Sequence, residues 1–136
     1  MKVYVDASAI VAMIAQEPEA TSFAERLGSF DDRITGPTAI WEAVRGVEGA
    51  RGVTFEEARS LVSDFLAEAK LRIVPIGPNE AEIALEAHQR FGKGVDEARL
   101  NFGDCSAYAC AKAQGAEIMF KGEDFIHTDL RDAMLG

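Results

Sequence analysis

The segment Val3-Tyr4-Val5-Asp6-Ala7-Ser8-Ala9-Ile10-Val11-Ala12 decides the fold. Its β-prone residues 3–5 predict a short strand that stops at Asp6. The uncharged run that follows, residues 7–16, predicts a buried helix. A strand that passes directly into a helix indicates an α/β chain, and the rest of the sequence continues this alternation.

Further strands are predicted at residues 34–35, 71–76 and 118–120, with Asp31 and Asp32 in a turn. Between these strands the apolar periodicity and the capping signals predict helices. They are expected after Pro18 up to Gly28, from Pro37 toward Gly49, after Thr54 through Leu66, over residues 81–88 up to Gly92, and from Asp104 to Gln114. The glycine-rich stretch around Gly49, from Gly46 to Gly52, is expected to be a loop.

This order predicts a three-layer α/β/α sandwich around a mostly parallel central sheet. The 136 residues carry no internal repeat and no change of composition, so we expect residues 1–136 to form a single domain. Cys105 and Cys110 lie five residues apart on one expected helix and point to different faces. We therefore expect two small core residues and no local disulfide.

The charge balance limits the range of functions. There are 14 Lys and Arg residues against 23 Asp and Glu, giving a net charge of -9, which argues against nonspecific coating of nucleic acid. The longest uncharged stretch, residues 7–16, is far below the roughly 20 residues that span a bilayer. The sequence therefore predicts a soluble, cytoplasmic protein with no membrane partner.

Four carboxylates are flanked by apolar or tightly packed sequence: Asp6, Glu42, Asp104 and Asp124. Desolvating a carboxylate is costly unless it is paired, hydrogen-bonded or bound to a metal. Asp6 and Asp124 directly follow predicted parallel strands, and ligand sites gather at the carboxyl ends of such strands. An all-oxygen cluster with few neighbouring cations predicts a site for Mg²⁺ or Mn²⁺.

Each of these carboxylates also has a purely structural interpretation. Asp6 and Asp104 both fit helix N-caps. Glu42 and Arg45 have the spacing of an ion pair within one helix. Asp124 fits a turn after Gly122. The two sets of interpretations stay open at the level of the sequence.

Four motifs in order resemble a PIN-domain ribonuclease, and more narrowly the VapC toxins of toxin–antitoxin pairs. They are the opening segment, Thr-Ala-Ile-Trp-Glu-Ala at 38–43, Leu-Asn-Phe-Gly-Asp-Cys-Ser-Ala-Tyr-Ala-Cys-Ala-Lys at 100–112, and Phe-Lys-Gly-Glu-Asp-Phe at 120–125 with Thr128 and Asp129. The resemblance covers essentially the whole chain. It implies that Asp6, Glu42, Asp104 and Asp124 bind metal, with Asp129 as a fifth acidic member. Ser8 and Thr38 match positions that hold a small hydroxyl near the site.

The resemblance also implies an activity and partners. The expected reaction is Mg²⁺-dependent hydrolysis of RNA phosphodiester bonds by water, with Mn²⁺ as an alternative ion and a structured RNA such as tRNA as substrate. Five cations are candidates to guide the phosphates: Arg45, Arg51, Arg99, Lys112 and Lys121. The expected protein partners are a small VapB-like antitoxin and a second copy of the chain.

Some features favour other interpretations. The loop 92–99 carries Val95-Asp96-Glu97, which is more acidic than the resemblance implies. A noncatalytic PIN scaffold that binds RNA or a protein is the first alternative. A Mg²⁺-dependent phosphatase also begins with a strand ending in Asp, but it needs Asp-x-Asp, and Ser8 stands at the second position.

Overall fold

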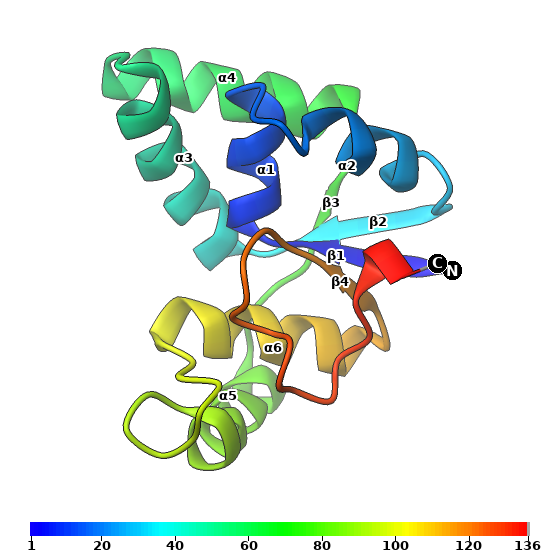
Figure 1. The fold of residues 1–136 in the computed structure, drawn as a ribbon, viewed down its shortest axis with the longest axis vertical. Helices are drawn as coiled ribbons and strands as arrows, with labels where there is room; N and C mark the ends of the chain where they lie inside the picture. The colour runs from blue at the N-terminus through cyan, green and yellow to red at the C-terminus, as the bar shows by residue number, and fades with distance from the viewer. Residues whose placement is uncertain (136) are drawn as a thin grey trace.

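The computed structural model describes residues 1–135 and contains four strands, six α-helices and one short 3₁₀ helix (Figure 1). In chain order the elements are β1 (Lys2–Val5), α1 (Ala7–Ile14), α2 (Ala20–Leu27), β2 (Asp32–Thr35), α3 (Pro37–Arg51), α4 (Phe55–Glu68), β3 (Arg72–Ile73), α5 (Pro78–Phe91), α6 (Phe102–Gln114), β4 (Glu117–Met119) and η1 (Ala133–Leu135). The predicted alternation of strands and helices is confirmed.

The sheet has the strand order β3-β2-β1-β4, and all three neighbouring pairs are parallel. Helices α1 to α4 lie on one side of the sheet, and α5 and α6 cover the other (Figure 1). This is the predicted three-layer sandwich. Because every strand runs the same way, the four carboxyl ends meet at one edge of the sheet, where parallel sheets hold their ligands.

The core centres on β1, whose two neighbours in the sheet are β2 and β4. Val3, Tyr4 and Val5 are at most 1% exposed, as expected of a central strand covered on both faces. Cys105 and Cys110 are buried and unbonded, which confirms their predicted place in the core.

The glycine-rich segment was predicted wrongly. Gly46 and Gly49 both lie inside α3, which continues to Arg51 and ends at Gly52 in the left-handed conformation. A Cβ at Gly46 would lie 2.7 Å from Val11 Cγ2, so the bare backbone there permits the close approach of α1 to α3. Packing between two helices, and not a loop, accounts for this glycine.

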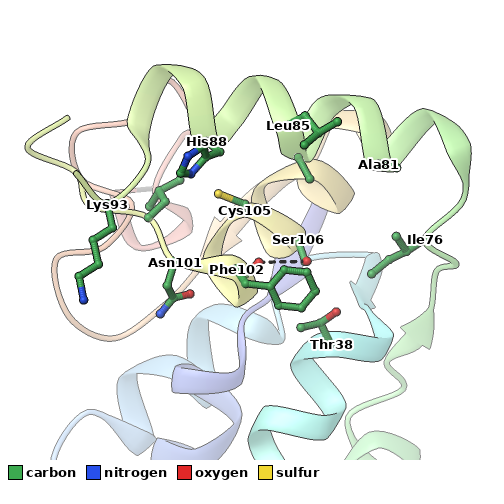
Figure 2. A pocket seen from close by; sticks show the side chains of 12 residues that line it. Thr38, Ile76, Ala81, Leu85, His88, Lys93, Asn101, Phe102, Cys105 and Ser106 are labelled. Carbon is green, nitrogen blue, oxygen red and sulfur yellow. Dashed lines mark hydrogen bonds between the residues drawn. The ribbon is translucent and has the colours of Figure 1, made fainter. Parts of the chain in front are cut away.

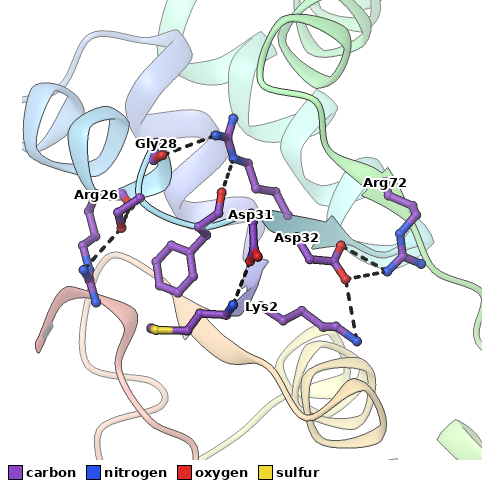
Figure 3. A network of polar contacts seen from close by, with 10 residues as sticks. Lys2, Arg26, Gly28, Asp31, Asp32 and Arg72 are labelled. Carbon is purple, nitrogen blue, oxygen red and sulfur yellow. Dashed lines mark hydrogen bonds and ion pairs between the residues drawn. The ribbon is translucent and has the colours of Figure 1, made fainter.

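The edge of the sheet also differs from the prediction. Strand β3 covers only Arg72–Ile73, both exposed, where six residues were expected. Asp32 begins β2 and does not form a turn, because its carboxylate bridges two neighbouring strands. It accepts hydrogen bonds from Arg72 at 3.1 and 3.2 Å and lies 3.7 Å from the Lys2 ammonium (Figure 3). These ion pairs join the amino ends of the strands, opposite the edge that holds the candidate site.

Within residues 1–135, no helix combines the length and the apolar character that crossing a bilayer requires.

Candidate active site

An acidic hollow of about 550 Å³ opens at the carboxyl edge of the sheet. Four of its lining residues are the carboxylates singled out from the sequence: Asp6, Glu42, Asp104 and Asp124. The other lining residues are Ala7, Ser8, Val11, Glu17, Asn101, Lys121 and Gly122. The structure thus brings together side chains from the ends of β1 and β4 and from α1, α3 and α6.

Asp6 is held at the end of β1, and the residue is only 7% exposed. Its N–H donates to Met119 O at 2.9 Å, which fixes the backbone against β4. Its carboxylate caps α1 by accepting from the N–H of Ser8 at 3.1 Å and from the Ser8 hydroxyl at 2.6 Å. Asp6 therefore both caps α1 and lines the acidic hollow.

Ser8 connects the segments that follow β1 and the edge strand β4. While its hydroxyl donates to Asp6, the same oxygen accepts from the N–H of Lys121 at 3.0 Å. Lys121 lies two residues after β4, in the segment that leads to Asp124. This hydrogen-bonding role agrees with the sequence interpretation of Ser8 as a hydroxyl near the site.

Asp104 belongs to the first turn of α6, and its residue is 9% exposed. The interpretation of Asp104 as an N-cap is wrong, because Asn101 caps the helix. Asn101 Oδ1 accepts from the N–H of Asp104 at 2.8 Å, and Asp104 Oδ2 accepts from the N–H of Asn101 at 3.2 Å. This capping box fixes one Asp104 oxygen, and within residues 1–135 the other accepts no hydrogen bond.

Glu42 reaches the site from α3 across the start of α6. Its carboxylate lies against Gly103, where a Cβ would overlap Glu42 Oε2 and lie 2.7 Å from Glu42 Cδ. The predicted ion pair with Arg45 is wrong, because the Arg45 guanidinium instead contacts Glu48, 3.1 Å from Nε to Oε1. Among residues 1–135, no basic side chain forms an ion pair with Glu42, Asp6 or Asp104.

Burial and the neighbouring negative charges raise the pKa of all three carboxylates. Burial raises the pKa of Asp104 to about 7, and the charges of Asp124, Asp6 and Glu42 add to the shift. Burial likewise raises the pKa of Asp6, opposed by the hydrogen bonds from Ser8 and supported by the charge of Asp124. Burial raises the pKa of Glu42 too, and the charges of Asp6 and Asp124 contribute. The carboxylates therefore repel one another in a partly dry site.

Asp124 lies in the exposed turn after β4, as its second interpretation predicted. It lines the acidic hollow on one side and a second polar hollow of about 400 Å³ on the other. That second hollow is also lined by Glu97, Arg99 and His127, so the acidic loop 92–99 lies beside Asp124. His127 Nδ1 is 3.6 Å from Glu97 Oε1.

Asp129 and Thr38 lie outside the acidic hollow. Asp129 accepts from the Tyr108 hydroxyl at 2.6 Å and from the Lys112 ammonium at 2.8 Å, and it lies 3.8 Å from Arg90. These partners lower the pKa of Asp129 despite an opposing effect of burial. Thr38 lines two neighbouring hollows described below.

Most of the nearby basic side chains form ion pairs or hydrogen bonds with other residues. The Lys121 ammonium lies 2.9 Å from Glu17 and 3.5 Å from Glu19. Lys112 is held by Asp129. Arg51 donates to the carbonyl of Ile14 at 3.0 Å. Glu17 was not predicted from the sequence, and it brings a fifth carboxylate to the rim of the hollow.

The donor set fits a hard divalent cation. Asp6, Glu42, Asp104 and Asp124 offer only oxygen ligands, which Mg²⁺ and Mn²⁺ prefer. A dication would also offset the repulsion that raises the pKa of three of these groups. In the described part of the chain, however, no three acidic, histidine or cysteine side chains are gathered closely enough to form a complete ligand set. The side chains must therefore turn toward one another to share an ion.

Two apolar hollows adjoin the acidic one. The larger, about 620 Å³, lies between α5 and the start of α6, and Phe102 stands at its rim (Figure 2). The smaller, about 430 Å³, is lined by Pro37, Thr38, Trp41, Glu42 and Phe102. Glu42 therefore faces both the smaller hollow and the acidic site.

Besides Glu17, two residues at the site were missed in the sequence. Asn101 stands three residues before Asp104, and this capping-box spacing was available as a signal. Gly103 offered no signal, because its contact with Glu42 joins residues 61 positions apart in the chain.

Comparison with known proteins now assigns the family. Residues 3–130 match the PIN domain model. Ribonuclease VapC30 of Mycobacterium tuberculosis is 34% identical over 131 residues, covering 96% of this chain and 98% of that protein. VapC ribonuclease R02377 of Rhizobium meliloti is 35% identical over 139 residues, covering 93% and 98%. The chain therefore belongs to the PIN-domain family.

Within that family the chain falls among the VapC ribonucleases, since these relatives match it over nearly their full length. The fold agrees with the crystal structure of VapC20 of Mycobacterium tuberculosis, a toxin that cleaves the sarcin–ricin loop. The TM-score is 0.74 at 17% identity, covering 94% of this chain and 95% of that one. Members of the family generally use divalent metal ions.

Proposed function

We propose that this chain is an endoribonuclease toxin that hydrolyses RNA phosphodiester bonds with the help of Mg²⁺, or of Mn²⁺ in its place. The observation that carries the proposal is the set of carboxylates at one hollow, Asp6, Glu42, Asp104 and Asp124, three of which have raised pKa values and no cationic partner within the described residues. Such a cluster is costly in a protein that does not use it. This favours a catalytic site over a binding scaffold.

We assign the role of each residue from its burial and its hydrogen bonds. Asp6 and Asp104 are the most buried and most firmly oriented, so we assign them the central metal-binding role, with Glu42 and Asp124 completing the set. A bound divalent cation lowers the pKa of water and stabilises the charge of a phosphoryl transition state. Ser8 holds the Asp6 carboxylate in place. No side chain in the hollow is needed as a nucleophile.

The decisive experiment incubates the purified chain with total RNA in Mg²⁺, in Mn²⁺ and in EDTA, beside Asp6→Asn and Asp104→Asn. Asparagine caps helices as well as aspartate does, so α1 should still form in Asp6→Asn. We expect discrete, metal-dependent fragments from the wild type and none from either variant. End mapping of the fragments would identify the RNA and test whether a structured RNA such as tRNA is the substrate.

Glu25→Gln is the matched control, because Glu25 is an exposed carboxylate on α2, outside the acidic hollow. Circular dichroism should show all variants folded. Cleavage that continues in EDTA, or that survives in Asp104→Asn, would contradict the proposed site.

The assignment to the VapC ribonucleases also implies a partner. We propose that a small VapB-type antitoxin restrains the chain in the cytoplasm and that the chain pairs with a second copy of itself. Co-expression with the protein of the neighbouring gene should yield a stable complex with reduced cleavage. Analytical ultracentrifugation of the free chain would test the dimer, and a monomer at all concentrations would contradict it.

A further inference from the structure

Two large aromatic side chains stand exposed beside the acidic hollow. Trp41 is 64% exposed and directly precedes Glu42 on α3, and Phe102 is 81% exposed at the first turn of α6, two residues before Asp104. Exposing such large apolar surfaces to water is unfavourable and is typical of surfaces that bind something.

The two rings belong to one hollow that opens onto the candidate catalytic residues. Trp41 and Phe102 line the hollow of about 430 Å³ together with Thr38, and Glu42 lines both this hollow and the acidic one. The Phe102 ring projects from α6 toward Thr38 on α3 and is not folded into the core (Figure 2). A flat, apolar group that binds here therefore lies next to the acidic cluster.

The other side of Trp41 is basic. The Arg45 guanidinium lies over the Trp41 ring, 5.7 Å from its centroid, while it also contacts Glu48 at 3.1 Å. Trp41 and Arg45 share a further hollow of about 150 Å³ with Phe55 and Arg59. The hollows that share Glu42 and Trp41 thus pass from the acidic site to the aromatic rings and then to Arg45 on α3 and Arg59 on α4.

We propose that Trp41 and Phe102 form a subsite for an unpaired RNA base, and that Arg45 and Arg59 bind the phosphates of the strand that leads away from it. Proteins that bind single-stranded RNA combine aromatic rings, on which bases stack, with cations along the backbone. The inference rests on the proposed function and specifies it, because it requires the strand at the acidic cluster to be unpaired.

The distribution of charge favours RNA over a protein as the occupant. An apolar protein segment would be served by the rings alone, whereas here two arginines continue the aromatic surface away from the carboxylates. A polyanion with alternating flat bases and phosphates matches both features. Continuity with the acidic hollow through Glu42 places the bound strand where it can be cut.

The test measures binding in EDTA, so that cleavage does not interfere. The probe is a fluorescent, mixed-sequence, unpaired oligoribonucleotide of roughly 10 nucleotides, a length within the range of single-strand sites, and a duplex RNA of equal length serves for comparison. Trp41→Leu and Phe102→Leu keep an apolar side chain but remove the ring, and Trp41→Phe keeps a ring. Ile73→Ala is the matched control, because Ile73 is 53% exposed on the edge strand β3.

We expect each leucine variant to bind the unpaired RNA about tenfold more weakly, in line with the loss of one stacked base. Trp41→Phe and Ile73→Ala should bind like the wild type. Arg59→Gln should weaken binding and reduce the slope of log affinity against log salt by about one. The duplex should bind more weakly than the unpaired strand and should not respond to the leucine substitutions.

Unchanged affinity in both leucine variants would overturn the subsite, as would a wild type that binds only the duplex. Sedimentation is measured on the same samples. If Trp41→Asp converts a dimer into a monomer while Trp41→Leu binds RNA normally, the surface joins two copies of the chain and the inference is wrong. Cleavage in Mg²⁺ is scored separately. Binding that depends on the aromatic residues without any cleavage would contradict the proposed function, and cleavage without such binding would contradict the subsite alone.

Discussion

At the scale of single residues, the site has a glycine whose position leaves no room for a side chain beside a carboxylate. Glu42 lies so near Gly103 that a Cβ there would overlap Oε2 and lie 2.8 Å from Oε1. Because a glutamate side chain is flexible, we expect Gly103→Ala to displace the carboxylate at little cost in folding stability. Misplacing a catalytic group by about 1 Å can lower the rate about 100-fold. We therefore expect RNA cleavage to fall by about that factor, measured as kcat, with an unchanged melting temperature.

A second substitution separates displacement of Glu42 from general damage. Glu42→Asp shortens the side chain by one methylene and should itself reduce cleavage. In the double variant Gly103→Ala with Glu42→Asp, the shorter side chain at position 42 leaves room for the added methyl group. The two losses of cleavage activity should therefore not add. Full activity of Gly103→Ala alone would show that the position of Glu42 does not matter.

The titration of Asp104 gives a prediction about pH. The folded chain holds the pKa of Asp104 at about 7, above the ordinary value of 3.8 for an aspartate, because the side chain is buried. Between those values the native state binds more protons than the unfolded state, so the free energy of unfolding falls as pH rises from about 4 to 7. Without divalent cations, Asp104→Asn should remove this loss and be more stable than the wild type at pH 8, by about 1–2 kcal/mol after solvent screening.

Urea unfolding at pH 5 and pH 8 in EDTA measures the effect. The two proteins should differ most at pH 8 and clearly less at pH 5, because much of the loss between pH 4 and 7 has not yet occurred at pH 5. A wild type that is more stable than Asp104→Asn at pH 8 would contradict the predicted sign.

At the scale of elements, α3 contains two glycines with opposite roles. A Cβ at Gly46 would lie 2.7 Å from Val11 Cγ2, whereas a Cβ at Gly49 would meet nothing within 4 Å. Gly46→Ala should therefore overpack the contact between α1 and α3 and destabilise the chain by about 1–3 kcal/mol. Gly49→Ala should stabilise it by about 0.5–1 kcal/mol, because alanine has the higher helix propensity.

Chemical denaturation of the two variants checks this pair, with Val11→Ala as the companion of Gly46→Ala. Removing the Val11 methyl groups should recover part of the stability lost in Gly46→Ala. Equal effects at the two glycines would contradict the packing explanation and would fit a propensity effect alone.

The elements that could be predicted from the sequence are those whose signals are local. The helix at Phe55–Glu68 follows from the box between Thr54 and Glu57, and the structure contains both of its hydrogen bonds, each 3.2 Å long. Strand β1 follows from a run of β-prone residues. The short edge strand β3 and Gly46 inside α3 were misjudged, because their structure depends on neighbours distant in sequence, such as Val11 beside Gly46.

The same limit applies to the candidate site. Asp6 and Asp124 could be placed near one another because parallel strands end at one edge of a sheet. The sequence could not show that Asp129 lies outside the acidic hollow. Its partners Tyr108 and Lys112 lie on α6, about 20 residues away in the chain. Asp129 thus differs from the carboxylates of the hollow because the fold places basic side chains beside it.

At the scale of the whole molecule, the two edges of the sheet differ in how their acidic side chains are paired. At the amino edge Asp32 is paired with Lys2 and Arg72, and Asp31 with the chain's N-terminus at 2.7 Å (Figure 3). At the carboxyl edge the acidic hollow has Lys121 as a neighbour, and Glu17 and Glu19 already hold its ammonium. The molecule therefore neutralises one edge internally, whereas at the other edge Asp6, Glu42 and Asp104 form no ion pair with any residue in 1–135.

This imbalance predicts that divalent cations stabilise the fold. A ligand that binds only the native state adds about 2.7 kcal/mol to the free energy of unfolding at 100 times its Kd. We expect Mg²⁺ or Mn²⁺ to raise the melting temperature of the wild type in a saturable manner, while NaCl of equal ionic strength does not. Asp104→Asn should lose most of the response, whereas Glu25→Gln should keep it. An equal rise in Asp104→Asn would mean that the cations screen the net charge of -9 in general and do not bind at the carboxyl edge of the sheet.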